Sequence, residues 1–519
     1  MSLYRSFFTV GSFTGLSRVL GFLRDILIAA VLGTGAVADA FFVAFRLPNL
    51  FRRLFAEGAF NSAFVPLFAK RLESEGEREA KAFAEEVLAM LLFALLLTTA
   101  LALVAMPLLI AIFAPGFAAN EEKFDLTVLL TRITFPYLLC MSLVALLSGI
   151  LNTLGRFSAA AFAPVILNLV LCAVMAAAAY LGLGNTPEAG ILLAWGVAFA
   201  GFLQLVFLAL MSRRSGMDLG FRRPRLTPGV KRMVVLGIPG LIAGGVTQIN
   251  ITVGTIIASL QEGAVSFLYY ADRIYQLPLG IVGVAIGVVL LPDISRRLGA
   301  GDIEAVHNSQ NRSIEFALLL TLPAAVALAV IAEPIIRVLF ERGAFSAEDT
   351  RATAAALAAF AWGLPAFVLI KVFSPGFFAR EDTKTPMYYA AAGMVVNVVG
   401  SLALFFWIGH VGIAVATTIA GWVNALLLGA TLARRGHLVA DAALLKRVPL
   451  LMASSAAMGA LLYFASTGIN GYFDPAGGVL RQVTALGALI AAGFIVYVLI
   501  ANLSGAMTLS MFRRALRRG

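Results

Sequence analysis

The sequence of 519 residues is 61% apolar and only 13% charged, and its mean hydropathy is +0.93. About a quarter of the residues in soluble domains are charged, so this composition excludes a soluble globular protein and indicates a membrane protein. The net charge of +11 does not require a nucleic-acid partner, because Lys and Arg collect on the cytoplasmic loops of membrane proteins.

Apolar runs of about 20 residues recur along the whole chain, and each is long enough to cross the hydrocarbon core as a helix. The runs do not alternate apolar and polar residues, which excludes a transmembrane β-barrel. The sequence therefore predicts an all-α polytopic membrane protein with about fourteen transmembrane helices. They are expected at residues 7–32, 36–57, 83–113, 124–151, 158–183, 187–211, 233–259, 264–292, 312–340, 350–378, 385–408, 411–434, 446–467 and 480–505.

The sequence carries no motif for catalysis or metal binding. The two cysteines, Cys140 and Cys172, lie inside apolar runs. The three histidines, His307, His410 and His437, have no partner at the spacing of metal ligands. No nucleotide-binding loop, zinc-protease motif or serine-hydrolase motif occurs. We therefore expect no catalytic residue and no metal site, and the protein is not expected to be an enzyme.

The connections between the predicted helices alternate in charge. One set is basic and includes Arg213 to Arg232 and the tail from Arg513 to Arg518. The other set is short and neutral or acidic, and it includes Gln261-Glu262 and Asn470 to Asp474. Because basic loops stay on the cytoplasmic side, we expect both termini in the cytoplasm and the 470–476 loop in the periplasm.

The sequence also repeats itself at a shift of about 227 residues, at which Arg46 aligns with Arg273 and Gly149 with Gly376. Each half then contains six helices, an even number, so the halves share one membrane orientation and a pseudo-two-fold axis along the membrane normal. This predicts an N-terminal lobe at 1–222, a C-terminal lobe at 223–437 and two added helices at 438–519. Two such lobes suit transport by alternating access.

Ionisable residues inside membrane helices cost roughly 2.5 to 3.5 kcal/mol each, so their positions point to function. In the first predicted helix, an arc of about 140° carries Gly11, Thr14, Ser17, Arg18, Gly21, Arg24 and Asp25. The second helix carries Asp39, Arg46, Asn49, Arg52 and Arg53, and the eighth carries Tyr269, Asp272, Arg273 and Gln276.

Arginines outnumber the acids in these helices, which favours an anionic substrate. A guanidinium group binds phosphate oxygens bidentately and keeps its charge at physiological pH. Two other readings stay open: the charges form ion pairs that hold the bundle together, or the arginines near the basic side extend to the membrane surface. Asp25, Asp39 and Asp272 each have an arginine close in sequence, which favours charge balance over acid-base catalysis.

Several segments form a pattern that is more specific than apolar composition. Those in the first two helices and just after them are Ser17-Arg18-Val19-Leu20-Gly21-Phe22, Ala38-Asp39-Ala40-Phe41-Phe42, Leu47-Pro48-Asn49-Leu50 and Phe55-Ala56-Glu57-Gly58-Ala59-Phe60. Those further along are Ala114-Pro115-Gly116-Phe117, Tyr269-Tyr270-Ala271-Asp272-Arg273, Lys371-Val372 and Pro375-Gly376-Phe377. These segments resemble the MurJ (MviN) family of lipid II flippases. The likeness runs from the first helix to the last, and the stretch from Asp39 to Pro66 is its most specific part.

The resemblance implies a flippase of the multidrug/oligosaccharidyl-lipid/polysaccharide exporter superfamily. Such a protein moves lipid II from the cytoplasmic to the periplasmic leaflet of the bacterial inner membrane, for peptidoglycan synthesis, cell-wall biogenesis and cell shape. The substrate-binding residues that the resemblance implies, in a central cavity, are Arg18, Arg24, Arg52, Arg273, Asp25, Asp39, Asn49, Asp272 and Gln276. Gln276 stands where some members have Glu. The last two helices are expected to form a groove for the polyprenyl tail.

Some members of that family bind sodium among the helices of the second lobe. The residues that would ligate a monovalent cation here are Asn250, Asn397 and Thr417 or Thr418, and no carboxylate accompanies them. No other cofactor is expected. The expected partners are lipid II, membrane lipids and the cell-wall synthesis machinery, without nucleic acid, and the protein is expected to be a monomer.

Other functions stay open on the residues alone. A drug or cation antiporter of the same superfamily would present acids and aromatic rings to its substrate, which the arginine-rich helix faces do not. An exporter of another polyprenyl-linked glycan would present the same arginines, because a pyrophosphate attracts them whatever sugar it carries. A membrane glycosyltransferase would need a carboxylate base and often a metal. The surplus of arginines also suggests coupling to the membrane potential, which is worth about 2.3 kcal/mol per charge at 100 mV.

Overall fold

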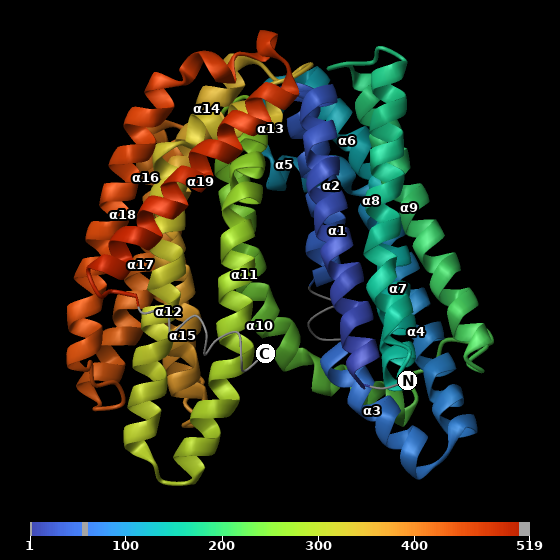
Figure 1. The fold of residues 1–519 in the computed structure, drawn as a ribbon. Helices are drawn as coiled ribbons and strands as arrows, with labels where there is room; N and C mark the ends of the chain where they lie inside the picture. Colours follow the sequence, from blue (N-terminus) through green and yellow to red (C-terminus); the bar gives the residue numbers. More distant parts are fainter. Residues whose placement is uncertain (1–2, 54–60, 508–519) are drawn as a thin grey trace. The chain divides into compact units, whose positions relative to one another are not determined.

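The computed structural model describes residues 3–53 and 61–507, and this part of the chain contains nineteen α-helices and no β-strand (Figure 1). The helices of the first half are α1 (Leu3–Leu32), α2 (Ala36–Arg52), α3 (Asn61–Ser74), α4 (Glu77–Val104), α5 (Met106–Phe113), α6 (Glu121–Thr134), α7 (Tyr137–Thr153), α8 (Phe157–Tyr180) and α9 (Pro187–Arg214). Those of the second half are α10 (Pro228–Ala258), α11 (Ala264–Gly299), α12 (Ile303–Val330), α13 (Ala332–Phe340), α14 (Ala347–Ala361), α15 (Leu364–Phe378), α16 (Lys384–Ile408), α17 (His410–Arg434), α18 (Ala442–Gly468) and α19 (Val479–Leu503). The predicted all-α architecture is confirmed.

Each predicted membrane segment coincides with one helix or with two consecutive helices, although the end of the segment predicted at 36–57 lies outside the described residues. Among the described residues, ten spans are long and apolar enough to cross a membrane. They are α4, α8, α9, α12, α16, α17, α18, α19 and the consecutive pairs α6 with α7 and α14 with α15. The chain is therefore a multi-pass membrane protein, and the count of fourteen crossings stays a prediction.

The internal repeat is visible in the helix boundaries. Adding 227 to the bounds of α6, 121–134, gives 348–361, and α14 spans Ala347–Ala361. Adding 227 to the bounds of α8, 157–180, gives 384–407, and α16 spans Lys384–Ile408. The interruptions repeat as well, because the break at Ala105 between α4 and α5 corresponds within one residue to the break at Ile331 between α12 and α13. The two halves therefore have the same helical layout.

Prolines explain these interruptions. Pro107, Pro334 and Pro365 lie in the first turns of α5, α13 and α15, where the missing N–H leaves no hydrogen bond unmade. The same prolines cannot continue the helix that precedes them. The segments predicted as single helices at 83–113, 124–151, 312–340 and 350–378 are each interrupted, the second of them directly before α7 at Pro136, and in this detail the prediction was wrong.

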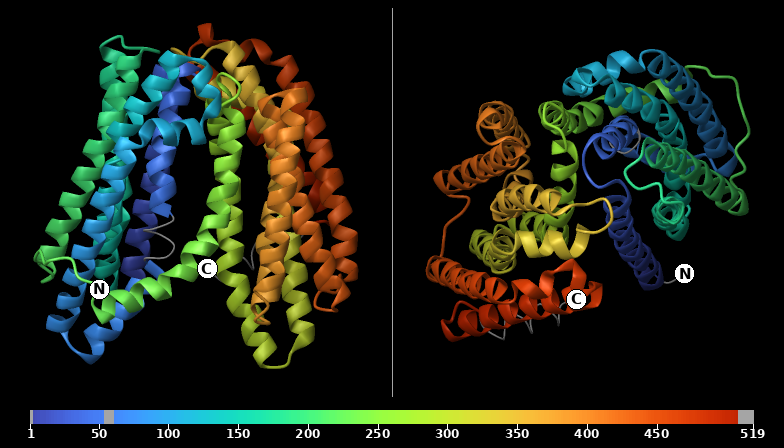
Figure 2. Two further views of the ribbon diagram at one scale, coloured as in Figure 1. Left: turned by 180° about the vertical axis from the view of Figure 1, so that it is seen from behind. Right: turned by 90° about the horizontal axis from the view of Figure 1, so that it is seen from above.

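The chain divides into two compact units. The first contains Met1–Ser266 and the short stretch Gly343–Phe345, and the second contains Phe267–Arg342 and Ser346–Gly519. In the first unit α1 packs along α8, α8 along α9 and α2 along α6 (Figure 1). In the second unit α16 packs along α17, α12 along α18 and α18 along α19 (Figure 2). The lobe boundaries predicted at residues 222 and 437 were drawn from the sequence repeat, and the division into compact units does not test them. They stay predictions.

Helix α3, for which the sequence analysis makes no prediction, is amphipathic and packs within the first unit. Its fully buried Phe64 stacks on Phe68 and on Phe83 of α4, with ring centroids 5.5 and 5.8 Å apart. The guanidinium carbon of Arg71 lies 4.3 Å from the centroid of the Phe83 ring. The apolar side of α3 thus packs into the core of the first unit. Because its other side is charged, the hydropathy of the sequence does not predict a membrane span here.

Candidate functional site

Arg24 on α1 is held in a buried ion pair. Its Nε and Nη2 donate to Oδ1 of Asp25 at 3.1 and 2.7 Å, and its Nη1 donates to Oδ1 of Asn168 on α8 at 3.0 Å. Arg24 is 7% exposed and Asp25 is 2% exposed. Asn168 also donates to the backbone oxygen of Ser17 at 2.8 Å, so one amide ties α8 to two turns of α1. Of the roles considered for these charges, Arg24 and Asp25 therefore have the first in this structure: they form an ion pair inside the helix bundle.

Arg18 has different surroundings, although it lies on the same polar face of α1. Its side chain is exposed, and no residue in 3–53 or 61–507 forms an ion pair or hydrogen bond with it. Gly11 and Gly15 on the same helix also face open space. Because an ionised group at membrane depth is costly unless it meets water or a counter-ion, Arg18 offers a charge that an anionic ligand can neutralise.

Asp39 on α2 is fully buried and accepts four hydrogen bonds. Lys123 Nζ donates to Oδ2 at 2.8 Å and the backbone N of Gly263 donates to Oδ2 at 2.9 Å. Ser266 donates to Oδ1 twice, from its backbone N at 3.0 Å and from its Oγ at 2.6 Å. We refer to Asp39, Lys123, Gly263 and Ser266 as the Asp39 cluster. With both oxygens engaged and none of its surface exposed, Asp39 fastens α2 to α6 and to the start of α11.

The sequence analysis missed Lys123, the charged partner of Asp39. Its Nζ also lies 4.2 Å from the centroid of the Phe117 ring, and Lys123 is 6% exposed. Sequence spacing gave no direct signal, because Lys123 is 84 residues from Asp39. One signal was available. Lys123 lies in the first turn of α6 after Glu121 and Glu122, and the helix dipole disfavours a cation there, so the lysine indicates a partner elsewhere.

Two glycines near the Asp39 cluster lie too close to neighbouring backbone for any side chain. A Cβ on Gly116, in the short 3-10 helix Pro115–Ala119, would overlap the carbonyl group of Ser259 at the end of α10. A Cβ on Gly343, which is 227 residues later, would overlap the carbonyl group of Ala30 on α1. Gly343 also has φ of 60°, which disfavours other residues. Both contacts belong to the first unit, and with the Asp39 cluster they hold the ends of α1, α2, α6 and α10 together.

The remaining predicted residues of the first unit lie at the end of α2. Asn49 donates through Nδ2 to the backbone oxygen of Phe45 at 2.7 Å and accepts from Nε of Arg52 at 3.1 Å. Arg46 donates through Nη1 to the hydroxyl of Thr255 on α10. The structure therefore brings Asn49 and Arg52 together, and Asn49 orients the guanidinium group of Arg52.

Asp272, Arg273 and Gln276 belong to the second unit and lie together on α11. Nη2 of Arg273 donates to the phenolic oxygen of Tyr269 at 3.0 Å, and its guanidinium carbon lies 4.8 Å from the centroid of that ring. Nε2 of Gln276 donates to Oδ2 of Asp272. An ionised carboxylate at position 276 could not donate this bond, so the amide of Gln276 is suited to the neighbouring carboxylate of Asp272.

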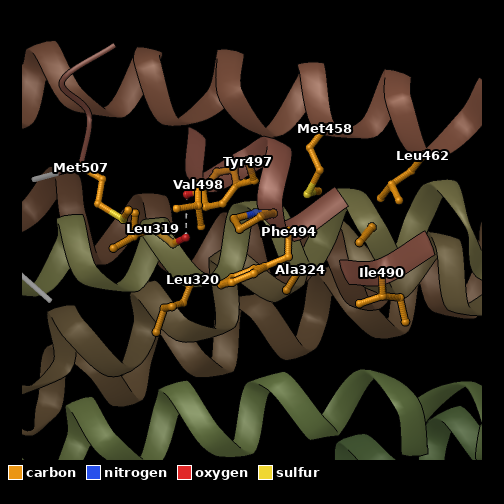
Figure 3. A pocket seen from close by; sticks show the side chains of 12 residues that line it. Leu319, Leu320, Ala324, Met458, Leu462, Ile490, Phe494, Tyr497, Val498 and Met507 are labelled. Atoms are coloured by element: carbon orange, nitrogen blue, oxygen red, sulfur yellow. Dashed lines mark hydrogen bonds between the residues drawn. The ribbon is translucent and has the colours of Figure 1, made fainter. Parts of the chain in front are cut away.

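An apolar cavity of about 260 Å³ lies between α12, α18 and α19, all in the second unit, and it is partly open because Phe494 in its lining is 58% exposed. Figure 3 shows the side chains that line it, among them Leu319, Ala324, Met458, Leu462, Phe494 and Tyr497. The hydroxyl of Tyr497 donates to the backbone oxygen of Leu319 at 2.7 Å, so the lining has little unsatisfied polarity. Such a cavity favours a hydrocarbon ligand over a polar one.

The residues considered for a sodium site do not fit one. Oδ1 of Asn397 accepts hydrogen bonds from Ser401 at 3.3 Å and from Thr417 at 3.2 Å, so these groups already satisfy one another. Thr418 donates to the backbone oxygen of Ala359 at 2.8 Å. A sodium ion would need oxygen ligands free to converge on it, with charge to offset its own. No step of transport is therefore assigned to sodium.

A duplicated bundle of membrane-spanning helices with a polar helix face and an apolar cavity is the architecture of a membrane transporter. A family model described as "Lipid II flippase MurJ" matches residues 28–484. A protein of Rhizobium meliloti (strain 1021), "Probable lipid II flippase MurJ", is 53% identical over 520 residues, which cover 100% of this chain and 97% of the relative. The chain belongs to the MurJ family of lipid II flippases.

Solved structures agree with this membership. The chain matches "Lipid II flippase MurJ, inward closed conformation" with a TM-score of 0.78 and 26% identity, over 98% of this chain and 99% of that one. It also matches an inward-facing multidrug resistance MATE family transporter of the MOP superfamily, with a TM-score of 0.68 and 15% identity over 82% and 97% of the two chains. The second likeness shows a shared fold.

Proposed function

We propose that the protein translocates lipid II, the undecaprenyl-pyrophosphate-linked peptidoglycan precursor, from the cytoplasmic to the periplasmic leaflet of the bacterial inner membrane. The observation that carries this proposal is the 53% identity to a probable lipid II flippase along the whole chain. A match of that extent includes the polar faces of α1 and α2 as well as the apolar helices that any membrane protein shares.

The pyrophosphate is bound by arginines, and Arg18 is the first candidate because its charge has no partner among the described residues. Arg52 and Arg273 are held by Asn49 and Tyr269, which fix the planes of their guanidinium groups for bidentate contact with phosphate. Arg24 supports the same face of α1 through its pair with Asp25, and Asp272 and Gln276 balance the charge around Arg273. Asp39 acts through the position of α2 rather than by touching substrate.

The polyprenyl tail occupies the apolar cavity between α12, α18 and α19. Its lining of leucine, alanine, methionine and aromatic side chains matches a branched hydrocarbon chain. This assigns the last two helices the role of a tail groove, separate from the arginines that bind the head.

Transport proceeds by alternating access, in a monomer with both termini in the cytoplasm. With that orientation the Asp39 cluster and the contacts of Gly116 and Gly343 lie on the periplasmic side of the first unit. The membrane potential acts on the surplus of arginines and drives the cycle, and the cell-wall synthesis machinery receives the exported lipid.

A cysteine at position 470 tests the topology. In a variant lacking Cys140 and Cys172, Asn470→Cys should react with an impermeant thiol reagent in intact spheroplasts, and protection would overturn the orientation.

Depletion of the protein in its host, followed by measurement of lipid II on each side of the membrane, tests the function. Accumulation of lipid II in the cytoplasmic leaflet is the expected result. Normal lipid II export with a defect in another polyprenyl-linked glycan would refute the proposal and favour that glycan as substrate.

Proteoliposomes with the membrane potential clamped at zero test the coupling, because undiminished transport there would exclude a role for the membrane potential.

A further inference from the structure

A second apolar crevice in the second unit is independent of the proposed tail groove. It has a volume of about 500 Å³ and lies between α17 and α18, with α12 and α15 behind it. Its lining includes Leu318, Phe373, Trp422, Ala430, Leu445 and Pro449. On α18 these residues occupy the first turns after Asp441, whereas Met458 and Leu462 of the tail groove lie further along the helix. The two cavities therefore use different parts of α18.

The crevice opens toward the membrane. Two of its lining residues, Leu426 of α17 and Leu445 of α18, are 63% and 64% exposed, as expected of side chains that face lipid. Because the lining is almost entirely apolar, water gains no hydrogen bonds there and hydrocarbon fits better. The volume falls in the range of small-ligand sites, which suits a single acyl chain.

Cations border the end of the crevice where α17 joins α18. Arg435 donates to Asp382 at 2.7 Å and Arg447 to Glu315 at 2.9 Å, so both of these charges are balanced within the protein. Arg434 and Lys446 are exposed, and no residue in the described part of the chain pairs with either of them.

Helical spacing places Arg434 and Lys446 on the same helix faces as residues that line the crevice. Arg434 is four residues after Ala430 on α17, and Lys446 is three residues before Pro449 on α18. Residues three or four apart share a helix face, so each cation lies on the same face as a lining residue.

We propose that this crevice binds an anionic phospholipid, with one acyl chain between α17 and α18 and its phosphate at Arg434 and Lys446. The hydrocarbon fills the apolar lining, and the headgroup supplies the negative charge that the protein does not. This site is distinct from that of the transported lipid, and the proposal holds whatever the transported substrate is.

Trp422 lines the crevice and provides a local probe. The chain has four tryptophans, Trp195, Trp362, Trp407 and Trp422, so replacing the first three by Phe leaves a single reporter. The purified variant is placed in mixed vesicles that contain either brominated phosphatidylglycerol or brominated phosphatidylcholine, whose bromines quench tryptophan on contact. Trp422 should be half-quenched at a mole fraction of the anionic lipid several times lower than that of the neutral lipid.

Neutralising the two cations should remove this preference. Each cation near the surface contributes about fivefold to the attraction of anionic lipid, so Arg434→Gln/Lys446→Gln should make the two quenching curves coincide. The matched control is Arg213→Gln/Arg214→Gln at the end of α9, which removes the same charge and should leave the preference intact. A single-tryptophan variant that keeps Trp407, which is 87% exposed on α16, should show equal quenching by both lipids.

Filling the crevice gives a second readout that does not depend on charge. Ala430→Phe should reduce the quenching of Trp422 by both brominated lipids. The proposal is overturned if Trp422 shows no preference for the anionic lipid, or if the Arg434→Gln/Lys446→Gln variant keeps the preference. It is also overturned if equimolar undecaprenyl phosphate relieves the quenching, because the crevice would then belong to the polyprenyl carrier.

Discussion

Asp39 and Ser266 occupy equivalent positions of the two repeats, 227 residues apart, and they are hydrogen-bonded to each other. In a two-fold arrangement, equivalent residues contact one another only at the symmetry axis. The contacts of Gly116 with Ser259 and of Gly343 with Ala30 are also equivalent under this shift, within two residues. One pair of equivalent residues and two reciprocal backbone contacts therefore join the two repeats within the first unit.

Replacing Asp39 by Asn should lower the melting temperature of the purified protein by several degrees. The buried ammonium of Lys123 would lose its counter-ion, and breaking a buried ion pair costs about 3–5 kcal/mol. The double variant Asp39→Asn/Lys123→Met should recover most of the loss. Asp125→Asn, which changes an exposed acid on the same helix as Lys123, should have no effect. If the Asp39→Asn protein were as stable as the parent, the Asp39 cluster would not stabilise the fold.

Gly116→Ala and Gly343→Ala should each loosen the packing of the first unit at these contacts, because the added methyl group displaces the backbone of Ser259 or Ala30. A single cysteine at position 259, in a variant lacking Cys140 and Cys172, reports this change. Ser259 is 4% exposed, so the cysteine should react slowly with an impermeant thiol reagent and several times faster after either substitution. Gly15→Ala serves as the control, since a Cβ there meets nothing within 4 Å. Equal rates in all variants would refute the reciprocal contacts.

Arg18 and Arg24 should respond differently to replacement by Ala. Arg18→Ala should abolish complementation at normal membrane abundance, because a lost charge-assisted contact with phosphate costs roughly 1.5 to 3 kcal/mol. Arg24→Ala should instead reduce abundance, because it strands the buried carboxylate of Asp25. Asp25→Asn added to Arg24→Ala should restore the abundance. If Arg18→Ala also reduced abundance, its loss of function would no longer indicate an anion site.

The loop between α15 and α16 should be sensitive to acid in a narrow range. Hydrogen bonds from the backbone N and the hydroxyl of Thr385, and then one from Arg435, lower the pKa of Asp382 from 3.8 to about 2. A carboxyl group with a lowered folded-state pKa stabilises the fold above its unfolded pKa, and the contribution is lost as pH falls through the folded value. The melting-temperature gap between the parent and Asp382→Asn should therefore be constant above pH 4 and close between about pH 4 and 2. If the full difference in melting temperature persisted at pH 2, the ionised carboxylate of Asp382 would not be the cause of the difference.

Gln310 on α12 should be replaceable by Leu with a gain in stability. It is 2% exposed, and neither atom of its amide has a hydrogen-bond partner within residues 3–53 and 61–507. Replacing a buried unsatisfied polar group by an apolar group of similar size removes a desolvation cost of about 1–3 kcal/mol. Gln204→Leu is the matched comparison, because Nε2 of Gln204 donates to the backbone oxygen of Ala163 at 2.8 Å and its loss should destabilise. A lower melting temperature for Gln310→Leu would indicate that the amide has a partner of its own.

Apolar periodicity and the shift of 227 residues were sufficient to predict the helices and their duplication, because each helix satisfies its own backbone in the membrane. The interruptions at Ala105 and Ile331 were missed, although Pro107 and Pro334 signal them, because hydropathy alone does not detect a change of direction within an apolar run.

The candidate site could be predicted only as a set of residues on helix faces. The polar face of α1 is periodic and therefore readable, but the partners that decide the role of each charge come from distant elements. Asn168 reaches Arg24 across 144 residues, and Ser266 reaches Asp39 across 227. Sequence spacing therefore could not distinguish the paired Arg24 from the exposed Arg18, whose difference depends on tertiary packing.

The hydrogen bond between Asp39 and Ser266 also bears on how the chain evolved. If the two halves descend from one six-helix subunit that paired with its own copy, the residue at position 39 faced an identical residue across the axis. Two ionised aspartates in that place would repel each other, whereas two serines would not. Lys123, which balances Asp39, corresponds under the same shift to the uncharged Thr350. The pair of Asp39 and Lys123 against Ser266 and Thr350 is therefore a place where the two halves differ in charge although their backbones correspond.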